Sequence, residues 1–344
     1  MTRRRTRSYP IHSGSHWASG LLYCLMVVAI VSIAWIIRRQ ISHEGPIVTH
    51  RESSGSMSEQ SAKTVIAMPD PVVVPEQVSP SHDRVSRLFP RVLSTREVTV
   101  LATTDGVDLA RVADMVGVAS RVCRQLLQGG AVAGPEEPDL CVAICDVEKL
   151  VTQVHEALRL PPMPSYMSAM NPSGFYVHER RTIVIGPRSR SPLGTVAHEA
   201  AHAVIESLVP GCPDALNEGF ADVVTELCLA ERNELRSYVV RRRDSRRQAL
   251  SLLMKYRSVP SLGTFCSLDR RGFRDRNVSF HFQLAWCLAE AILELDRKSE
   301  VPRLPAMWRS MAAGEGPVVT IDSLYGVGAV QARWRDVVAR CADG

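Results

Sequence analysis

The run His198-Glu199-Ala200-Ala201-His202 constrains this chain more than any other feature. In an α-helix, residues i and i+4 lie on one face, about 6 Å apart along the axis, so both imidazoles can reach one metal ion. Glu199 directly follows the first histidine, and its carboxylate therefore lies near the open side of such an ion. Two histidines and a glutamate at this spacing are typical of a catalytic zinc site that takes its third ligand from elsewhere in the chain.

The flanking sequence predicts that this motif lies on a helix. Ser191-Pro192 is typical of an N-cap followed by proline at the first helical position, and Pro210-Gly211 is typical of a helix end. Between them, alanine and aliphatic residues recur with helical spacing. The apolar run Thr182-Ile-Val-Ile185, just before the helix, predicts a short strand.

Glu218 is the candidate for the third ligand. Residues 203–217 suffice for a helix end, a turn and the start of a second helix, which would return Glu218 to the metal from an antiparallel neighbour. Asp222 lies four residues later on the same helix face. Its carboxylate could accept the second N–H of a ligating histidine and fix the ring orientation. Asn217 is expected only to shape the start of this helix.

The two motifs His198-Glu-Ala-Ala-His202 and Asn217-Glu-Gly-Phe-Ala-Asp222 together resemble the gluzincin metallopeptidases. The resemblance implies one Zn²⁺ held by His198, His202 and Glu218, with Glu199 as general base and Asp222 as the carboxylate partner of a ligand histidine. No further cofactor is predicted. The strand nearest the zinc helix of a gluzincin lies along the cleft, so the resemblance implies that residues 182–186 could pair with an extended peptide.

Weaker similarity extends over roughly residues 95–340. Gly174 to His178 and Arg181 to Ile185 resemble the strand–turn–strand that precedes the zinc helix in small, single-domain peptidase-MA-like proteins. Phe282 to Trp286 resembles a later helix of those proteins, which often begins with tyrosine.

Phe282 is the one departure that matters, because gluzincins commonly place a tyrosine or histidine to stabilise the tetrahedral oxyanion. The phenylalanine has no hydroxyl group. His281 is a candidate for this role, and Tyr256 and Tyr325 are open alternatives. The departure bears on catalytic efficiency more than on metal binding.

Residues 17–37 contain no charged side chain and are long enough, at about 21 residues, to cross a bilayer core of roughly 30 Å. Four arginines within residues 1–16 outnumber the two at positions 38 and 39, which predicts a cytoplasmic basic tail and a catalytic domain in the periplasm or outside the cell. A cleaved signal peptide is the competing interpretation. Its apolar region is usually 7–15 residues, so the length of this run favours an uncleaved anchor in the lipid bilayer.

Residues 38–94 are rich in serine and proline and predict a flexible linker. Residues 95–344 form the predicted domain. Their pattern of short apolar strands followed by a mainly helical second half predicts an α+β fold, in which a small mixed sheet packs on the zinc helix. The resemblance implies that this fold is zincin-like. Residues 280–295 predict a strongly buried helix.

The cysteine content permits disulfides. One of nine cysteines lies in the predicted anchor, and the remaining eight could form disulfides in an oxidising compartment, with Cys212 and Cys228 as one candidate pair beside Glu218.

The net charge of +5 is modest, and the basic run 241–247 is read as a solvated helix face rather than a site for an anionic partner. No nucleotide-binding or nucleic-acid-binding motif is present, so no nucleic-acid partner is predicted.

The sequence thus leads to the hypothesis of a membrane-anchored zinc peptidase that hydrolyses a peptide or protein substrate outside the cytoplasm. One alternative is a catalytically inactive, metal-binding scaffold or substrate-binding domain tethered to the membrane, which the phenylalanine at position 282 motivates. The other is a tethered interaction module in which the histidine motif is a coincidence. The sequence leaves the substrate, the cleavage preference and the oligomeric state open.

Overall fold

The computed structural model describes residues 80–129, 140–161, 173–232, 235–256, 258–275 and 277–343, all within a compact unit that spans residues 74–344. The predicted basic tail and transmembrane segment 17–37 lie outside the described residues. Within the described residues, one helix, Val278–Asp296, is long and apolar enough to cross a membrane. Half of its apolar window is buried inside the fold, as expected for a core helix.

A five-stranded mixed sheet forms one part of the unit, with the strand order β1-β2-β3-β5-β4. The strands are β1 (Arg91–Ser94), β2 (Val98–Ala102), β3 (Leu140–Ile144), β4 (Gly174–Val177) and β5 (Thr182–Ile185). The three inner strands are parallel, and each edge strand is antiparallel to its neighbour. The inner strands are apolar and buried along their whole length, as parallel strands covered on both faces must be.

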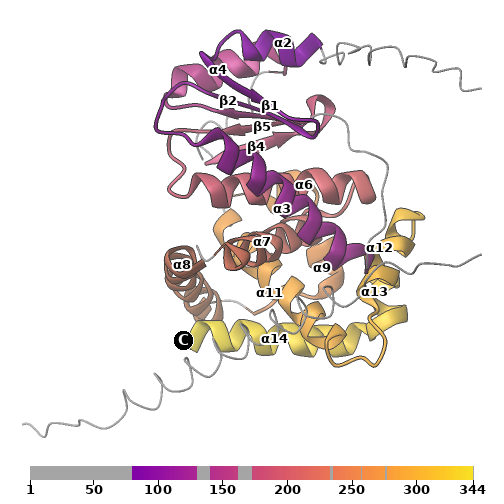
Figure 1. Ribbon diagram of the computed structural model, residues 1–344. Helices are drawn as coiled ribbons and strands as arrows, with labels where there is room; N and C mark the ends of the chain where they lie inside the picture. Colours follow the sequence, from indigo (N-terminus) through magenta and orange to yellow (C-terminus); the bar gives the residue numbers. More distant parts are fainter. Residues whose placement is uncertain are drawn as a thin grey trace, which may run out of the picture. The chain divides into compact units, whose positions relative to one another are not determined.

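Helices cover both faces of this sheet (Figure 1). On one face lie α2 (Pro80–Ser86) and α4 (Glu148–Ala157), which bury Leu101 and Val184 in a small apolar cluster. On the other face lie α3 (Leu109–Gln128) and α6 (Pro192–Leu208), which bury Val100 and Ile183 in the main core. Neighbouring strand residues thus divide between the two faces, because successive side chains of a strand point to opposite sides.

The rest of the chain is helical, which confirms the predicted α+β arrangement with a mainly helical second half. It comprises α7 (Asp214–Glu231), α8 (Leu235–Tyr256), α9 (Leu262–Cys266), α10 (Arg270–Phe273), α11 (Val278–Asp296), α12 (Leu304–Ala312), α13 (Pro317–Tyr325) and α14 (Val327–Asp343). The motif-bearing α6 packs on α7, and α7 packs in turn on α11. The predicted burial of α11 is confirmed, since one side of this helix lies wholly in the core.

The fold begins before the predicted boundary at residue 95. Helix α2 and strand β1 lie in the range predicted as linker, yet Val85 and Phe89 are buried in the smaller cluster, and β1 pairs with β2. The polar composition of residues 80–94 hides these elements, because α2 is short and β1 alternates between half-buried and exposed residues. The linker prediction is thereby confined to residues before 80, which lie outside the described residues.

A second correction concerns the strand that borders the motif helix. Residues 182–186 were expected along the cleft, but β5 lies inside the sheet between β3 and β4. The chain reverses at the 3-10 helix η1 (His178–Arg180), so β4 is added to the outer side of β5. Strand β4 is therefore the edge strand on this side of the sheet.

Gly219 allows α7 and α11 to approach closely. A Cβ atom at this position would lie 2.3 Å from the carbonyl oxygen of Ala285 and 2.8 Å from its carbon, both of them backbone atoms of α11. We expect Gly219→Ala to force the two helices apart and to lower the free energy of unfolding by about 3 kcal/mol, at the upper end for overpacking a core. Denaturant unfolding of the full-length chain measures this change.

Gly117 on α3 supplies the matched control, because a Cβ atom there meets nothing within 4 Å. Gly117→Ala is expected to stabilise the chain by up to about 1 kcal/mol through helix propensity. Equal stability of the two variants would contradict the close approach of α7 and α11.

Candidate metal centre

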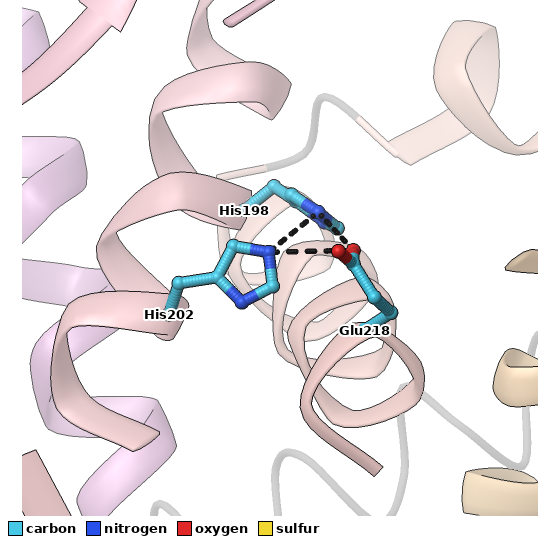
Figure 2. Close-up of side chains that lie close together, drawn as sticks. All are labelled: His198, His202 and Glu218. Carbon is cyan, nitrogen blue, oxygen red and sulfur yellow. Dashed lines mark hydrogen bonds and ion pairs between the residues drawn. The ribbon is translucent and has the colours of Figure 1, made fainter. Parts of the chain in front are cut away.

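The motif residues come together because α6 and α7 are joined by a tight turn and pack side by side. Helix α6 begins with proline at its first position and ends at Leu208, and Gly211 then adopts a left-handed conformation with φ 74°. His198 and His202 lie one turn apart on α6, and Glu218 lies in the second turn of α7. Figure 2 shows the three side chains pointing toward one another from the two neighbouring helices.

Three donor atoms lie at the mutual distances that a small metal ion requires. The Nε2 atoms of His198 and His202 are 3.1 Å apart, and Oε2 of Glu218 lies 3.2 Å from the first and 3.4 Å from the second. Tetrahedral ligands with bonds of 2.0–2.2 Å to zinc lie roughly 3.3–3.6 Å from one another. The three residues therefore fit a metal ion and could hold one, as the clustering of their ligand atoms also indicates.

The other nitrogen atom of each imidazole lies against a side-chain oxygen. Nδ1 of His202 lies 2.7 Å from Oδ1 of Asn217, and Nδ1 of His198 lies 3.1 Å from Oδ1 of Asp222. When the Nδ1–H of His202 donates to Asn217, its Nε2 presents a lone pair to the common point. The Asp222 carboxylate beside Nδ1 of His198 favours the same tautomer there, although the contact lacks hydrogen-bond geometry. Such contacts fix the tautomer and the ring orientation of metal-binding histidines.

Asp222 thus lies beside one of the two candidate ligand histidines, as the sequence suggested, whereas the contact between Asn217 and His202 was not predicted. Asn217 directly precedes Glu218 in the first turn of α7. The prediction treated it only as part of the helix start, because an asparagine there is ordinary. Its place beside a metal-ligand candidate was the one signal in the sequence for a second role.

The charged side chains of the cluster shift one another's pKa values. Burial opposes protonation of His198, but the carboxylates of Asp222 and Glu218 outweigh it and raise the pKa of this imidazole to about 10. Burial also opposes ionisation of Glu218, but the two imidazoles outweigh it and hold its pKa well below the ordinary value. A metal ion must displace any proton on the two Nε2 atoms, so its binding tightens as the pH rises.

The cluster opens onto a cavity of about 900 Å³ that Glu199 also lines. Glu199 is 7% exposed, and its charge acts on both imidazoles, but it is not one of the three donor groups. Strand β4 borders the same cavity along its whole length, and Phe282 lines it from α11.

Two arginines that the sequence did not single out hold the buried carboxylates. Arg242 donates two hydrogen bonds to Asp222, at 2.7 and 3.0 Å, and the Asp222 side chain is 2% exposed. Arg274 donates from Nη2 to Oε1 of Glu218 at 2.6 Å. Charge-assisted bonds of this kind are stronger than neutral ones and compensate the cost of burying a carboxylate.

The basic run 241–247 is therefore only partly a solvated helix face. Arg242 pairs with Asp222, and Arg246 pairs with Glu226 at 3.1 Å while its guanidinium lies 3.3 Å from the ring centroid of Trp286. Two arginines four residues apart on α8 thus face two carboxylates four residues apart on α7. This matched spacing was the signal in the sequence that could have revealed the contact.

The candidates for oxyanion stabilisation do not join the cluster. Nδ1 of His281 lies 2.7 Å from the carbonyl oxygen of Phe273, and His281 is not among the residues that line the cavity. The hydroxyl of Tyr325 donates to Asp296 at 2.9 Å. The side chain of Tyr256 lies outside the described residues. Tyr238, which the sequence did not suggest, lines the cavity from α8.

The candidate link between Cys212 and Cys228 is not formed, and both residues are thiols. Cys212 precedes α7, and Cys228 lies near the other end of this continuous helix. The helix spans roughly 21 Å between Asp214 and Cys228, whereas a disulfide requires Cα atoms about 5.5–6 Å apart.

No protein-family model matches this chain, and no curated protein matches it either. The candidate centre therefore rests on its own residues. Two imidazoles and a carboxylate converge on one point, with oriented rings, a buried neighbouring glutamate and an adjoining cavity.

Proposed function

We propose that this chain is a zinc-dependent peptidase of the gluzincin type, anchored in a membrane by residues 17–37 and active outside the cytoplasm. The observation that carries the proposal is the convergence of His198, His202 and Glu218 beside Glu199 on one cavity. A structural zinc site is usually closed by four protein ligands, whereas a catalytic site has three and an open position. Among the described residues, the donor group consists of three.

Each residue of the centre has a role in this proposal. His198, His202 and Glu218 hold the ion, and Zn²⁺ in such a site supplies Lewis acidity that lowers the pKa of water and polarises a carbonyl group. Glu199 accepts the proton of the attacking water and later delivers it to the leaving amine. Asn217 and Asp222 keep the two imidazoles in the required tautomer and orientation.

A peptide is the substrate class that the surrounding structure favours. Strand β4 is the last strand of the sheet on this side and lines the cavity beside the donor atoms. An extended peptide can add to such an edge through main-chain hydrogen bonds, which places successive peptide groups along the strand. This mode of binding would carry a scissile bond past Glu199.

A membrane location follows from the uncharged run at residues 17–37 and the arginines on its N-terminal side. The proposal places the N-terminus in the cytoplasm and the catalytic domain in the periplasm or outside the cell. The serine- and proline-rich segment that follows would let the domain work at some distance from the bilayer.

A second candidate function is a metal-binding scaffold without turnover. Phe282 favours it, because this residue lines the cavity at the position where gluzincins commonly carry the tyrosine hydroxyl. Glu199 argues against the scaffold function, because a carboxylate buried beside an open metal position has no role in a purely structural site. The two functions differ in whether metal-loaded protein cleaves a peptide.

The test uses the full-length chain purified without chelators. Its metal content is measured, and it is incubated with a broad peptide library before and after treatment with a chelator and after re-addition of zinc. One zinc per chain with cleavage that the chelator stops and zinc restores supports the peptidase. One zinc per chain without cleavage of any library peptide indicates the scaffold, and protein without metal indicates that the motif is a coincidence.

A further inference from the structure

Arg274 contacts the candidate metal centre and lines the cavity beside it. It follows α10 and precedes α11, and its Nη2 atom donates to Oε1 of Glu218 at 2.6 Å. The Arg274 side chain is 17% exposed, and that of Glu218 is 3% exposed. The guanidinium carbon lies 6.0 Å from the ring centroid of Phe282, and both residues line the cavity.

The two carboxylate oxygens of Glu218 consequently have separate partners. Oε2 lies 3.2 and 3.4 Å from the two imidazole nitrogens, whereas Oε1 lies against Arg274. A carboxylate can bind a metal ion through one oxygen or through both. The choice matters in a catalytic site, because a second oxygen occupies the position that water or substrate needs.

We propose that Arg274 is a positioning residue that holds Glu218 as a one-oxygen ligand and so keeps a coordination position open on the metal. The inference rests on the proposed metal centre and goes beyond it, because the residue that keeps the coordination position open lies outside both sequence motifs. Arg274 acts through Glu218. Its planar guanidinium can fix the direction of the carboxylate, which the point charge of a lysine does less well.

Electrostatics and burial make this contact specific. Glu218 is almost fully buried, and a buried carboxylate needs a charged or hydrogen-bonding partner on each side that faces away from water. The short helix α10, which directly precedes Arg274, carries two further arginines, Arg270 and Arg271, and both are exposed. Arg271 does not line the cavity, so it offers a matched control for the loss of one positive charge.

The experiment uses the full-length chain loaded with Co²⁺ in place of zinc, without any peptide. The visible absorption of Co²⁺ is intense in four-coordinate sites and weak in sites of higher coordination number. The wild-type chain and Arg271→Gln are expected to show the intense absorption. Arg274→Gln is expected to lose most of it, because both oxygens of Glu218 can then turn toward the ion.

A small bidentate ligand gives a second readout. Acetohydroxamate needs open positions on the metal, and its binding is followed by the change in the Co²⁺ spectrum. We expect Arg274→Gln to bind it at least tenfold more weakly than the wild type, the lower end for loss of an outer partner of a metal ligand. Arg274→Lys should recover part of the affinity and of the absorption.

An unchanged spectrum and unchanged acetohydroxamate affinity in Arg274→Gln would overturn the inference. If Arg274→Gln does not fold, Arg274→Met replaces it, because methionine keeps an apolar stem and lacks the donor. The same spectrum and the same acetohydroxamate affinity are then measured on that variant. Because no peptide is involved, this outcome is separate from that of the proposed function. A wild-type chain that binds neither Co²⁺ nor zinc would overturn both.

Discussion

Replacing Glu199 with glutamine is expected to lower kcat/KM for peptide cleavage about 10²–10⁴-fold, the usual contribution of general acid–base catalysis. The amide has nearly the same size and shape as the carboxylate, but it cannot accept a proton from water. Glu199 is 7% exposed and lines the same cavity as His198. The three donor atoms are untouched, and the variant should therefore keep its metal.

Activity and metal content must be measured on the same preparation, because loss of the metal would also stop cleavage. Glu156→Gln is the control for the chemical change, since Glu156 lies exposed on α4 and does not line the cavity. It should cleave the same peptide at the wild-type rate. Full activity of Glu199→Gln, or loss of its metal, would remove Glu199 from the role of general base.

The helical motif was predictable because helix geometry alone brings i and i+4 together. His198 and His202 needed only the helix that Ser191-Pro192 and the apolar stripe indicate. Glu218 needed one further step, a turn short enough to return the chain alongside α6. The same local reasoning found Asp222, one helical turn beyond Glu218. Contacts within one helix, or between two helices joined by a short turn, are accessible to sequence reasoning.

Contacts that depend on distant segments were not accessible in this way. Arg274 reaches Glu218 across 56 residues, and no periodic pattern connects the two positions. The order of strands was hidden for a similar reason. Whether β4 or β5 forms the edge depends on which of these two hairpin strands pairs with β3, and both strands are short and apolar. Buried polar contacts and sheet order are set by the assembled core rather than by local spacing.

The first elements of the fold show that amino-acid composition alone does not predict where a domain begins. Residues 80–94 are polar enough to resemble a linker, yet Val85 and Phe89 are buried in the smaller apolar cluster on one face of the sheet. A few buried side chains can thus attach a segment whose average character is hydrophilic. Average composition predicts domain boundaries only where the segment lacks such anchors.

Replacing His202 with alanine is expected to lower the affinity for zinc more than a hundredfold, beyond the range for loss of an outer partner of a ligand. The substitution removes one of three donor atoms and leaves Oδ1 of Asn217 without the imidazole that it holds at 2.7 Å. Chelator competition measures the affinity. Thermal unfolding gives a second measurement, because zinc at 100 times its dissociation constant stabilises the wild-type chain by about 2.7 kcal/mol.

The His202→Ala variant should show little or no stabilisation at that zinc concentration. His281→Ala is the matched control, because Nδ1 of His281 lies against the carbonyl oxygen of Phe273 and the residue is outside the donor group, so its metal affinity should be unchanged. Taken with Glu199→Gln, the variant separates two properties of one helix. Loss of cleavage with metal retained assigns Glu199 to chemistry, and loss of both assigns His202 to metal binding. If His202→Ala retained one tightly bound zinc, the ion would lie elsewhere, and the convergence of the three side chains would no longer support a peptidase.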